Sequence, residues 1–197
     1  MDETRVQNLA FNIKALHSAY TVGMSPTSVV SECFRRIKSV EDPGIFLHLM
    51  DKKIIEAEVE ALGVFDPSAK PLWGIPFAIK DNIDAAGVLT TAGCPNFAYI
   101  AEKDAFVLNL LKSAGALLIG KTNLDQFATG LVGVRTPYRA PKNAIDPSIV
   151  PGGSSSGSAV SVSHGIVSFA LGTDTAGSGR VPAALNNVVG LKPSLGA

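Results

Sequence analysis

Two glycine- and serine-rich loops carry the residues with the most specific chemistry. The first is Gly153-Ser154-Ser155-Ser156-Gly157, and the second, residues 174–180, contains Ser178. Glycine admits backbone angles closed to other residues, so such loops can approach a substrate closely. This pairing suits attack on a carbonyl, because one loop can supply the nucleophile and the other a proton carrier. Taken alone, the first loop fits a flexible linker or a helix N-cap better.

The residues before Ser178 are small, which predicts an oxyanion hole built from converging backbone N–H groups. The donors would be the N–H groups of Thr175, Ala176, Gly177 and Ser178. Asp174 and Arg180 flank the loop, and a charge-assisted pair between them would fix its shape. A phosphate loop or an ordinary tight turn is the alternative, but the Gly-Lys-Ser/Thr of a phosphate loop is absent. Ala176 also disfavours the Gly-x-Ser-x-Gly nucleophile elbow.

A lysine ends the apolar segment Trp73–Lys80, which reads as a short buried strand. Desolvation there would depress the pKa of Lys80 and leave part of it as the neutral amine, which can accept a proton. The competing interpretation is an ion pair with Asp81 or Asp84. Taken alone, Lys80 fits the ion pair better.

Other catalytic and metal chemistries find no support in the sequence. His17, His48 and His164 are far apart, lack partners at metal-ligand spacing, and lie in no loop suited to a Ser-His-Asp triad. Cys33 and Cys94 cannot form a disulfide framework, which fits a reducing compartment. We therefore expect neither a metal nor an organic cofactor.

The bulk composition is that of a globular protein, with 46% apolar and 17% charged residues. Lys plus Arg and Asp plus Glu number 17 each, so charge favours neither a nucleic-acid nor a membrane partner. No apolar run reaches the roughly 18 residues of a membrane span. The N-terminus lacks the apolar region of a signal peptide. We expect a cytoplasmic protein that acts on a small molecule.

Hydrophobic periodicity predicts helices alternating with short strands. Residues 5–62 read as mainly helical, with one helix starting at Ser25-Pro26. Further helices are expected at 104–114 and 156–164. Strands are expected at 45–50, 73–80, 116–121 and 166–171. This alternation predicts an α/β sheet of parallel character.

Together these segments resemble the amidase signature family. The resemblance rests on residues 74–84, on Gly-Gly-Ser-Ser-Ser-Gly-Ser-Ala at 152–159, and on Asp-Thr-Ala-Gly-Ser-Gly-Arg-Val-Pro at 174–182, and it covers about residues 71–193. Within the family, the details of residues 125–135, 176–180 and 186–193 look most like the allophanate hydrolases. General amidases and the glutaminyl-tRNA amidotransferases more often have Gly-Gly-Ser-Ile-Arg, from which Ala176 and Gly179 depart.

The resemblance implies a Ser-cisSer-Lys triad that hydrolyses an amide through an acyl-enzyme. Ser178 would be the nucleophile, Ser154 would follow a cis peptide bond and relay protons, and Lys80 would be the base. Gly130 would line the substrate pocket. The substrate implied is an amide or ureide such as allophanate, hydrolysed in urea breakdown with release of ammonia. The resemblance implies no cofactor. It does imply that the protein forms a homo-oligomer.

The implied fold is a mixed α/β sheet flanked by helices, with a helical lead-in over residues 1–65. Residues 66–197 would form the N-terminal portion of an amidase catalytic domain, because the family's domain is more than twice this length. Three explanations of this short length are open: the chain is a truncated gene product, a fragment, or a chain that a partner completes. The rival functions are a catalytically silent half-domain, a general amidase, and one component of an amidotransferase that works on charged tRNA.

Overall fold

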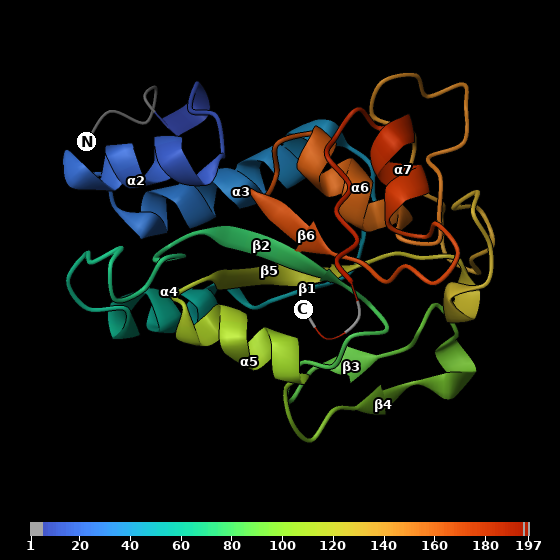
Figure 1. Cartoon of the computed structure of the whole chain (residues 1–197), viewed down its shortest axis with the longest axis horizontal. Coiled ribbons are helices and arrows are strands. Elements are labelled where there is room, and N and C mark those ends of the chain that lie inside the picture. The colour runs from blue at the N-terminus through green and yellow to red at the C-terminus, as the bar shows by residue number, and fades with distance from the viewer. Residues whose placement is uncertain (1–5, 195, 197) are drawn as a thin grey trace.

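A four-stranded mixed sheet lies at the centre of the molecule (Figure 1). The computed structural model describes residues 6–194 and residue 196. The strand order is β1 (Phe46–Leu49), β5 (Leu117–Thr122), β2 (Pro76–Lys80) and β6 (Phe169–Leu171). β2 pairs in parallel with both β5 and β6, whereas β1 is antiparallel to β5 at one edge. The predicted mixed α/β class is confirmed.

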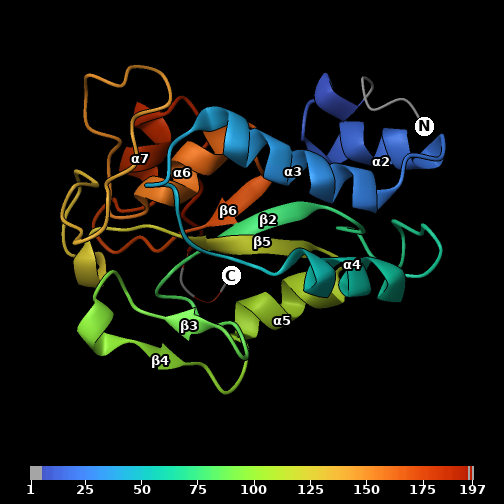
Figure 2. The same cartoon turned by 180° about the vertical axis from the view of Figure 1, so that it is seen from behind.

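Helices cover both faces of this sheet, which is why its two central strands are buried along their whole length. One face carries the helices α2 (Ile13–Thr21), α3 (Pro26–Val40), α6 (Ser156–Ser163) and α7 (Arg180–Leu185) (Figures 1 and 2). The other face carries α4 (Lys52–Ala61) and α5 (Phe106–Ser113). Below them lies a small hairpin of β3 (Leu89–Thr90) and β4 (Tyr99–Ile100). Two short 3-10 turns complete the order, at Pro95–Phe97 and Gln126–Ala128.

Helix starts follow the local chemistry of the sequence. α3 begins as predicted, with Pro26 in its first turn and the Ser25 hydroxyl accepting the N–H of Thr27. Asp51 caps α4 in the same way by accepting the N–H of Lys53. These caps satisfy backbone donors that a helix start leaves without a partner.

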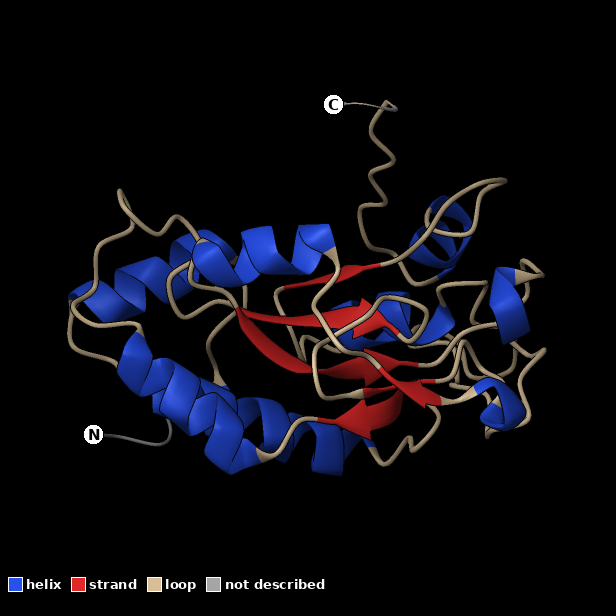
Figure 3. Cartoon of the chain, turned by 90° about the horizontal axis from the view of Figure 1, so that it is seen from below, coloured by secondary structure: helices blue, strands red, loops and turns tan. Residues whose placement is uncertain are grey.

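The pairing of β2 with β5 sets the direction of two buried lysines. Lys80 is the partner of Thr122, and Ile79 is the partner of Lys121. Because successive side chains of a strand point to opposite faces, Lys80 and Lys121 point to opposite faces of the sheet. Lys80 therefore faces the start of α6, and Lys121 faces the β3–β4 hairpin. Figure 3 shows the strands of the molecule with helices around them.

Several elements differ from the sequence-based expectations. The strand expected at 166–171 is confined to Phe169–Leu171, and β1 is half-buried because it lies at an edge. The β3–β4 hairpin and α7 were not predicted at all. Two-residue strands carry no readable periodicity. α7 is only six residues long and has Pro182 in its first turn, where proline costs no hydrogen bond.

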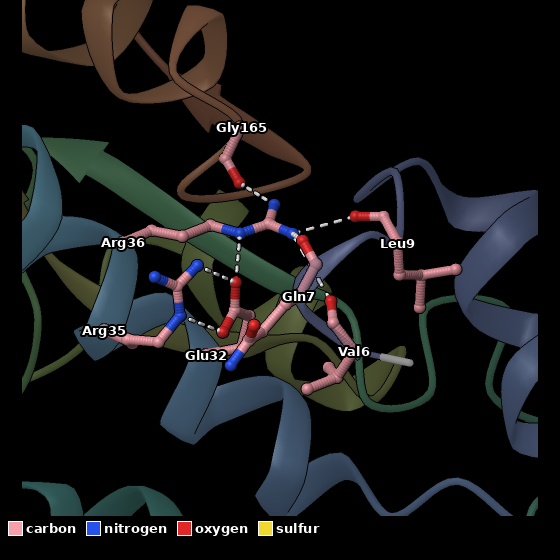
Figure 4. A network of polar contacts seen from close by, with 7 residues as sticks. All are labelled: Val6, Gln7, Leu9, Glu32, Arg35, Arg36 and Gly165. Atoms are coloured by element: carbon pink, nitrogen blue, oxygen red, sulfur yellow. Dashed lines mark hydrogen bonds and ion pairs between the residues drawn. The ribbon is translucent and has the colours of Figure 1, made fainter. Parts of the chain in front are cut away.

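A buried glutamate anchors the N-terminal segment to the rest of the chain (Figure 4). Glu32 accepts hydrogen bonds from Arg35 at 2.6 Å and from Arg36 at 2.8 Å. Burial raises the pKa of Glu32, but these two guanidinium groups outweigh that effect and lower it. Arg36 also donates to the carbonyl oxygens of Leu9 at 2.8 Å and Gly165 at 2.5 Å. It thereby joins the N-terminal segment, α3 and the turn after α6.

Candidate active site

The ends of two parallel strands bring a lysine and two hydroxyl groups together. Lys80 is the last residue of β2 and is completely buried. Its Nζ donates to Ser154 Oγ at 2.6 Å and to Thr173 Oγ1 at 2.7 Å. Ser154 precedes α6, and Thr173 follows β6. The structure thus brings Lys80 and Ser154 into contact and adds Thr173, which sequence reasoning missed.

Burial lowers the pKa of Lys80 from 10.5 to about 8, against the opposing charges of Asp125 and Asp174. Among the described residues Lys80 has no ion pair. The competing interpretation fails because Asp81 pairs with Lys121 at 3.2 Å and Asp84 accepts the hydroxyls of Thr90 and Tyr99. At neutral pH the neutral amine is therefore a minority form of Lys80, but a far larger fraction than in a lysine of ordinary pKa.

A buried aspartate, Asp125, supports the first serine loop through backbone hydrogen bonds. The peptide bond between Gly153 and Ser154 is cis. The Ser154 carbonyl accepts the N–H of Asp125 at 3.1 Å, and the Asp125 carboxylate accepts the N–H groups of Gly133 at 2.9 Å and Arg135 at 2.8 Å. A Cβ at Gly153 would lie 2.1 Å from Asp125 Oδ2, so only glycine fits there. No sequence signal marked Asp125 as a support.

Ser178 lies at the end of the second loop and is 7% exposed. Its carbonyl accepts the N–H of Ser155 at 3.1 Å, which ties the two serine loops together. Within residues 6–194 its Oγ has no hydrogen-bond partner, so no hydrogen bond joins it to Ser154 Oγ.

Asp174 organises the second loop as an acceptor for several N–H groups. It forms the expected pair with Arg180 at 2.9 Å and accepts the backbone N–H groups of Gly177 at 2.7 Å and Gly179 at 3.2 Å. The Arg180 guanidinium, with these backbone donors, holds the pKa of the Asp174 carboxyl well below its usual range. Gly177 has a φ of 116°, which favours glycine.

The engagement of Gly177 corrects one expectation for the oxyanion hole. Its N–H was expected to be free, but it donates to Asp174 Oδ1 because the loop folds back on that carboxylate. In the described part of the chain, the N–H groups of Thr175, Ala176 and Ser178 have no acceptor. Three of the four predicted donors are therefore free.

Gly130 lies beside Asp125, in the loop between Asp125 and Arg135. It is half-buried with a φ of 145°, and a Cβ there would lie 2.9 Å from Asp125 Oδ2. The next residue, Leu131, accepts the N–H of Gly153 at 2.9 Å. Gly130 therefore lies next to the carboxylate that supports the first serine loop, and its place in a substrate pocket stays a prediction.

A groove of about 560 Å³ runs beside the site, with Thr173, Asp174 and Gly179 along its wall. A larger groove of about 750 Å³ lies along α2 and α3, away from the two serine loops. Among residues 6–194 and 196, no group of three or more His, Cys, Asp or Glu side chains is placed to hold a metal ion. In the same described part, no helix is long and apolar enough to cross a membrane.

The amidase family model matches residues 28–197 of this chain. The chain belongs to the amidase family. Among curated amidase relatives, the urea amidolyase of Saccharomyces cerevisiae is 64% identical over 126 residues, which is 64% of this chain and 7% of the relative. A glutamyl-tRNA(Gln) amidotransferase subunit of Nitratidesulfovibrio vulgaris is 44% identical over 171 residues, or 85% of this chain and 35% of that protein.

Solved amidase structures share the fold. Kluyveromyces lactis allophanate hydrolase matches with a TM-score of 0.83 and 44% identity over 94% of this chain and 31% of its own. The peptide amidase of Stenotrophomonas maltophilia matches with a TM-score of 0.83 and 34% identity over 94% of this chain and 40% of its own. The chain spans less than half the length of these relatives.

Proposed function

We propose that this chain carries the catalytic triad of an amide hydrolase that acts on allophanate. Ser178 is the nucleophile, Ser154 the proton carrier and Lys80 the base. The observation that carries the proposal is the contact of 2.6 Å between Ser154 Oγ and the Nζ of a buried lysine that has no carboxylate partner in the described structure. Such a lysine can take a proton near neutral pH.

The proposed reaction moves a proton from Ser178 through Ser154 to Lys80. Ser178 Oγ attacks the carbonyl carbon while its proton passes to Ser154 Oγ, and the Ser154 proton passes to Lys80 Nζ. The free N–H groups of Thr175, Ala176 and Ser178 stabilise the oxyanion. When the tetrahedral intermediate collapses, the C–N bond breaks and the leaving nitrogen takes a proton from Ser154, which is reprotonated by Lys80. Water, activated by the same relay, then releases the acyl group from Ser178.

Allophanate is proposed as the substrate on the strength of the relatives. Urea amidolyases and an allophanate hydrolase are among them, at 64% and 44% identity. Ala176 and Gly179 also depart from the Gly-Gly-Ser-Ile-Arg version of the nucleophile loop. We place the catalytic portion at residues 66–197 and a mainly helical region at residues 1–65.

Similarity to the glutamyl-tRNA(Gln) amidotransferase at 44% identity supports a second candidate, in which the amide of glutamine is the source of ammonia. This candidate shares the same nucleophile and base. It differs in the substrate that the pocket accepts and in needing a partner protein.

Ammonia release by the purified chain tests these proposals. Parent, Ser178→Ala and Ser161→Ala are compared with allophanate, glutamine and a simple amide. Ser161 is a matched control, because it is a buried serine whose hydroxyl, among the described residues, bonds to the Ser158 carbonyl within α6 and not to the two serine loops. Release from allophanate by the parent and Ser161→Ala, but not by Ser178→Ala, is expected. Faster release from glutamine would favour the amidotransferase. No release by a folded chain would show that this portion is catalytically silent without a partner.

A further inference from the structure

We propose that Thr173 is a positioning residue that aims the lone pair of the Lys80 amine at Ser154. The inference rests on the proposed role of Lys80 as the base. Thr173 Oγ1 and Ser154 Oγ are the hydrogen-bond partners of Lys80 Nζ in the described structure, at 2.7 Å and 2.6 Å. One of the two oxygens takes part in the proton relay, which leaves the other to fix the direction of the amine.

The number of N–H donors and lone pairs on an amine explains why Lys80 needs a second oxygen besides that of Ser154. A lysine ammonium has three N–H donors and no lone pair, so both hydroxyls can accept from it. The neutral amine has two N–H donors and one lone pair. To accept the Ser154 proton, the lone pair must point at Ser154 Oγ, and an N–H of the amine must then point elsewhere. Thr173 Oγ1 accepts that N–H and so excludes the unproductive rotation.

Thr173 is held in place by its own backbone. Its N–H donates to Ser155 Oγ at 3.3 Å, and the Ser155 hydroxyl donates to its carbonyl at 3.3 Å. The pairing of Leu171 with Ile79 brings the chain after β6 beside the end of β2. A Cβ at Gly172 would lie 2.6 Å from Ser155 Oγ, so this approach requires glycine. Ser155 therefore fixes Thr173, and Thr173 fixes Lys80.

The charges around Lys80 predict how its titration responds to loss of the hydroxyl. Burial disfavours the ammonium, and the Asp125 and Asp174 carboxylates favour it. The Thr173 hydroxyl also favours the ammonium, because it accepts a hydrogen bond from it. Removing the hydroxyl should lower the pKa of Lys80 further while slowing proton transfer from Ser154. A residue that merely packed against the lysine would produce neither effect.

The positioning role is tested with three variants: Thr173→Val, Thr173→Ser and Thr90→Val. Valine keeps the shape of threonine without its hydroxyl, and serine restores the hydroxyl. Thr90→Val is the matched control, because Thr90 Oγ1 accepts from the other buried lysine, Lys121. The titration of Lys80 is followed by NMR of the full chain labelled with 13C at lysine Cε, and kcat and KM for allophanate are measured across pH.

We expect Thr173→Val to lower the titration midpoint of Lys80 by about one pH unit. We expect kcat to fall about tenfold with KM unchanged. Thr173→Ser should restore both, and Thr90→Val should leave the Lys80 titration unchanged. If Thr173→Val fails to fold, Thr173→Ala carries the same comparison.

An unchanged Lys80 midpoint in a folded Thr173→Val or Thr173→Ala chain overturns the proposal, and so does failure of Thr173→Ser to restore it. The NMR titration decides this without any turnover. Failure of the proposed function is recognised separately, by ammonia release that persists in Ser178→Ala or is absent from the parent.

Discussion

Lys80 and Lys121 lie on neighbouring parallel strands, and both are completely buried, yet their surroundings differ in kind. Lys80 is bonded to two hydroxyls. Lys121 is bonded to one hydroxyl, that of Thr90, and also contacts the Asp81 carboxylate at 3.2 Å and the Leu89 carbonyl at 2.9 Å. Burial lowers the pKa of both lysines, and the Asp81 charge opposes this at Lys121. The two lysines are equally buried, so the difference between them lies in their partners: the proposed base lacks an ion pair in the described structure, and Lys121 has one.

The largest expected effect comes from replacing the hydroxyl-bonded lysine. Lys80→Met should reduce ammonia release by roughly 10²–10⁴-fold, the usual contribution of a general base. The chain should remain as stable as the parent, because methionine removes a buried amine without leaving a buried carboxylate unpaired. Ammonia assays and urea unfolding on the same samples measure the two effects. A large loss of stability would contradict the contrast between the lysines.

Lys121→Met should behave in the opposite way. It leaves Asp81 buried without its cation, and breaking a buried pair typically costs about 3–5 kcal/mol of unfolding free energy. Urea unfolding of Lys121→Met gives this cost. The control is the double variant Lys121→Met/Asp81→Asn, which removes both charges and should recover part of the loss. Equal stabilities for the two variants would show that the ion pair is not the cause.

The pH dependence of the reaction should report Lys80. Because its pKa is lowered to about 8, kcat/KM should rise about tenfold from pH 7 to a plateau above pH 8. The free energy of unfolding should also depend on the titration of Lys80. Between about pH 8 and 10.5 the unfolded chain binds more protons at this site than the folded chain, so the penalty of burying Lys80 is relieved as pH rises through that window. A rate that is flat from pH 7 to 9 would argue against Lys80 as the base.

Asp174→Asn should have a smaller effect on turnover. The substitution weakens the acceptors for Gly177, Gly179 and Arg180 that shape the loop before Ser178. A fall in kcat of about tenfold is expected, less than the loss of an oxyanion donor itself. Steady-state kinetics with allophanate measure it. Arg180→Lys, which keeps the charge but loses the guanidinium fork, serves as the comparison.

The smallest effect is expected at the pairs of Glu32. The Arg35 side chain is 48% exposed, so Arg35→Ala should lower the free energy of unfolding only slightly. Arg36→Ala should cost more, because its 13% exposed side chain also bonds to Leu9 and Gly165. Thermal unfolding of both variants gives the comparison. Equal losses would show that the backbone contacts of Arg36 add nothing.

The sequence allowed the main elements of the fold to be predicted, because they carry strong local signals. β2, β5 and α3 have apolar runs or caps that can be read directly from the chain. The proposed triad residues Lys80, Ser154 and Ser178 were identified by the resemblance of their combined segments to the amidase signature family, because Lys80 and the first serine loop, each taken alone, fit structural roles better. Thr173, Asp125 and the Lys121–Asp81 pair were missed, since their roles come from strand pairing and from contacts across the chain. The Gly177 N–H was misjudged because its acceptor depends on how the loop folds back.

The hydrogen bonds of Lys80 also have a kinetic meaning. Lys80 is separated by 74 residues from Ser154 and by 93 residues from Thr173 along the chain. Contacts of such long range require loop closures whose entropy cost must be met before they form, and chains rich in them fold slowly. The site therefore has no precursor in any short segment of the chain. The lowered pKa of Lys80 should accordingly appear only when folding is complete, which makes the titration of this lysine a probe of the last folding step.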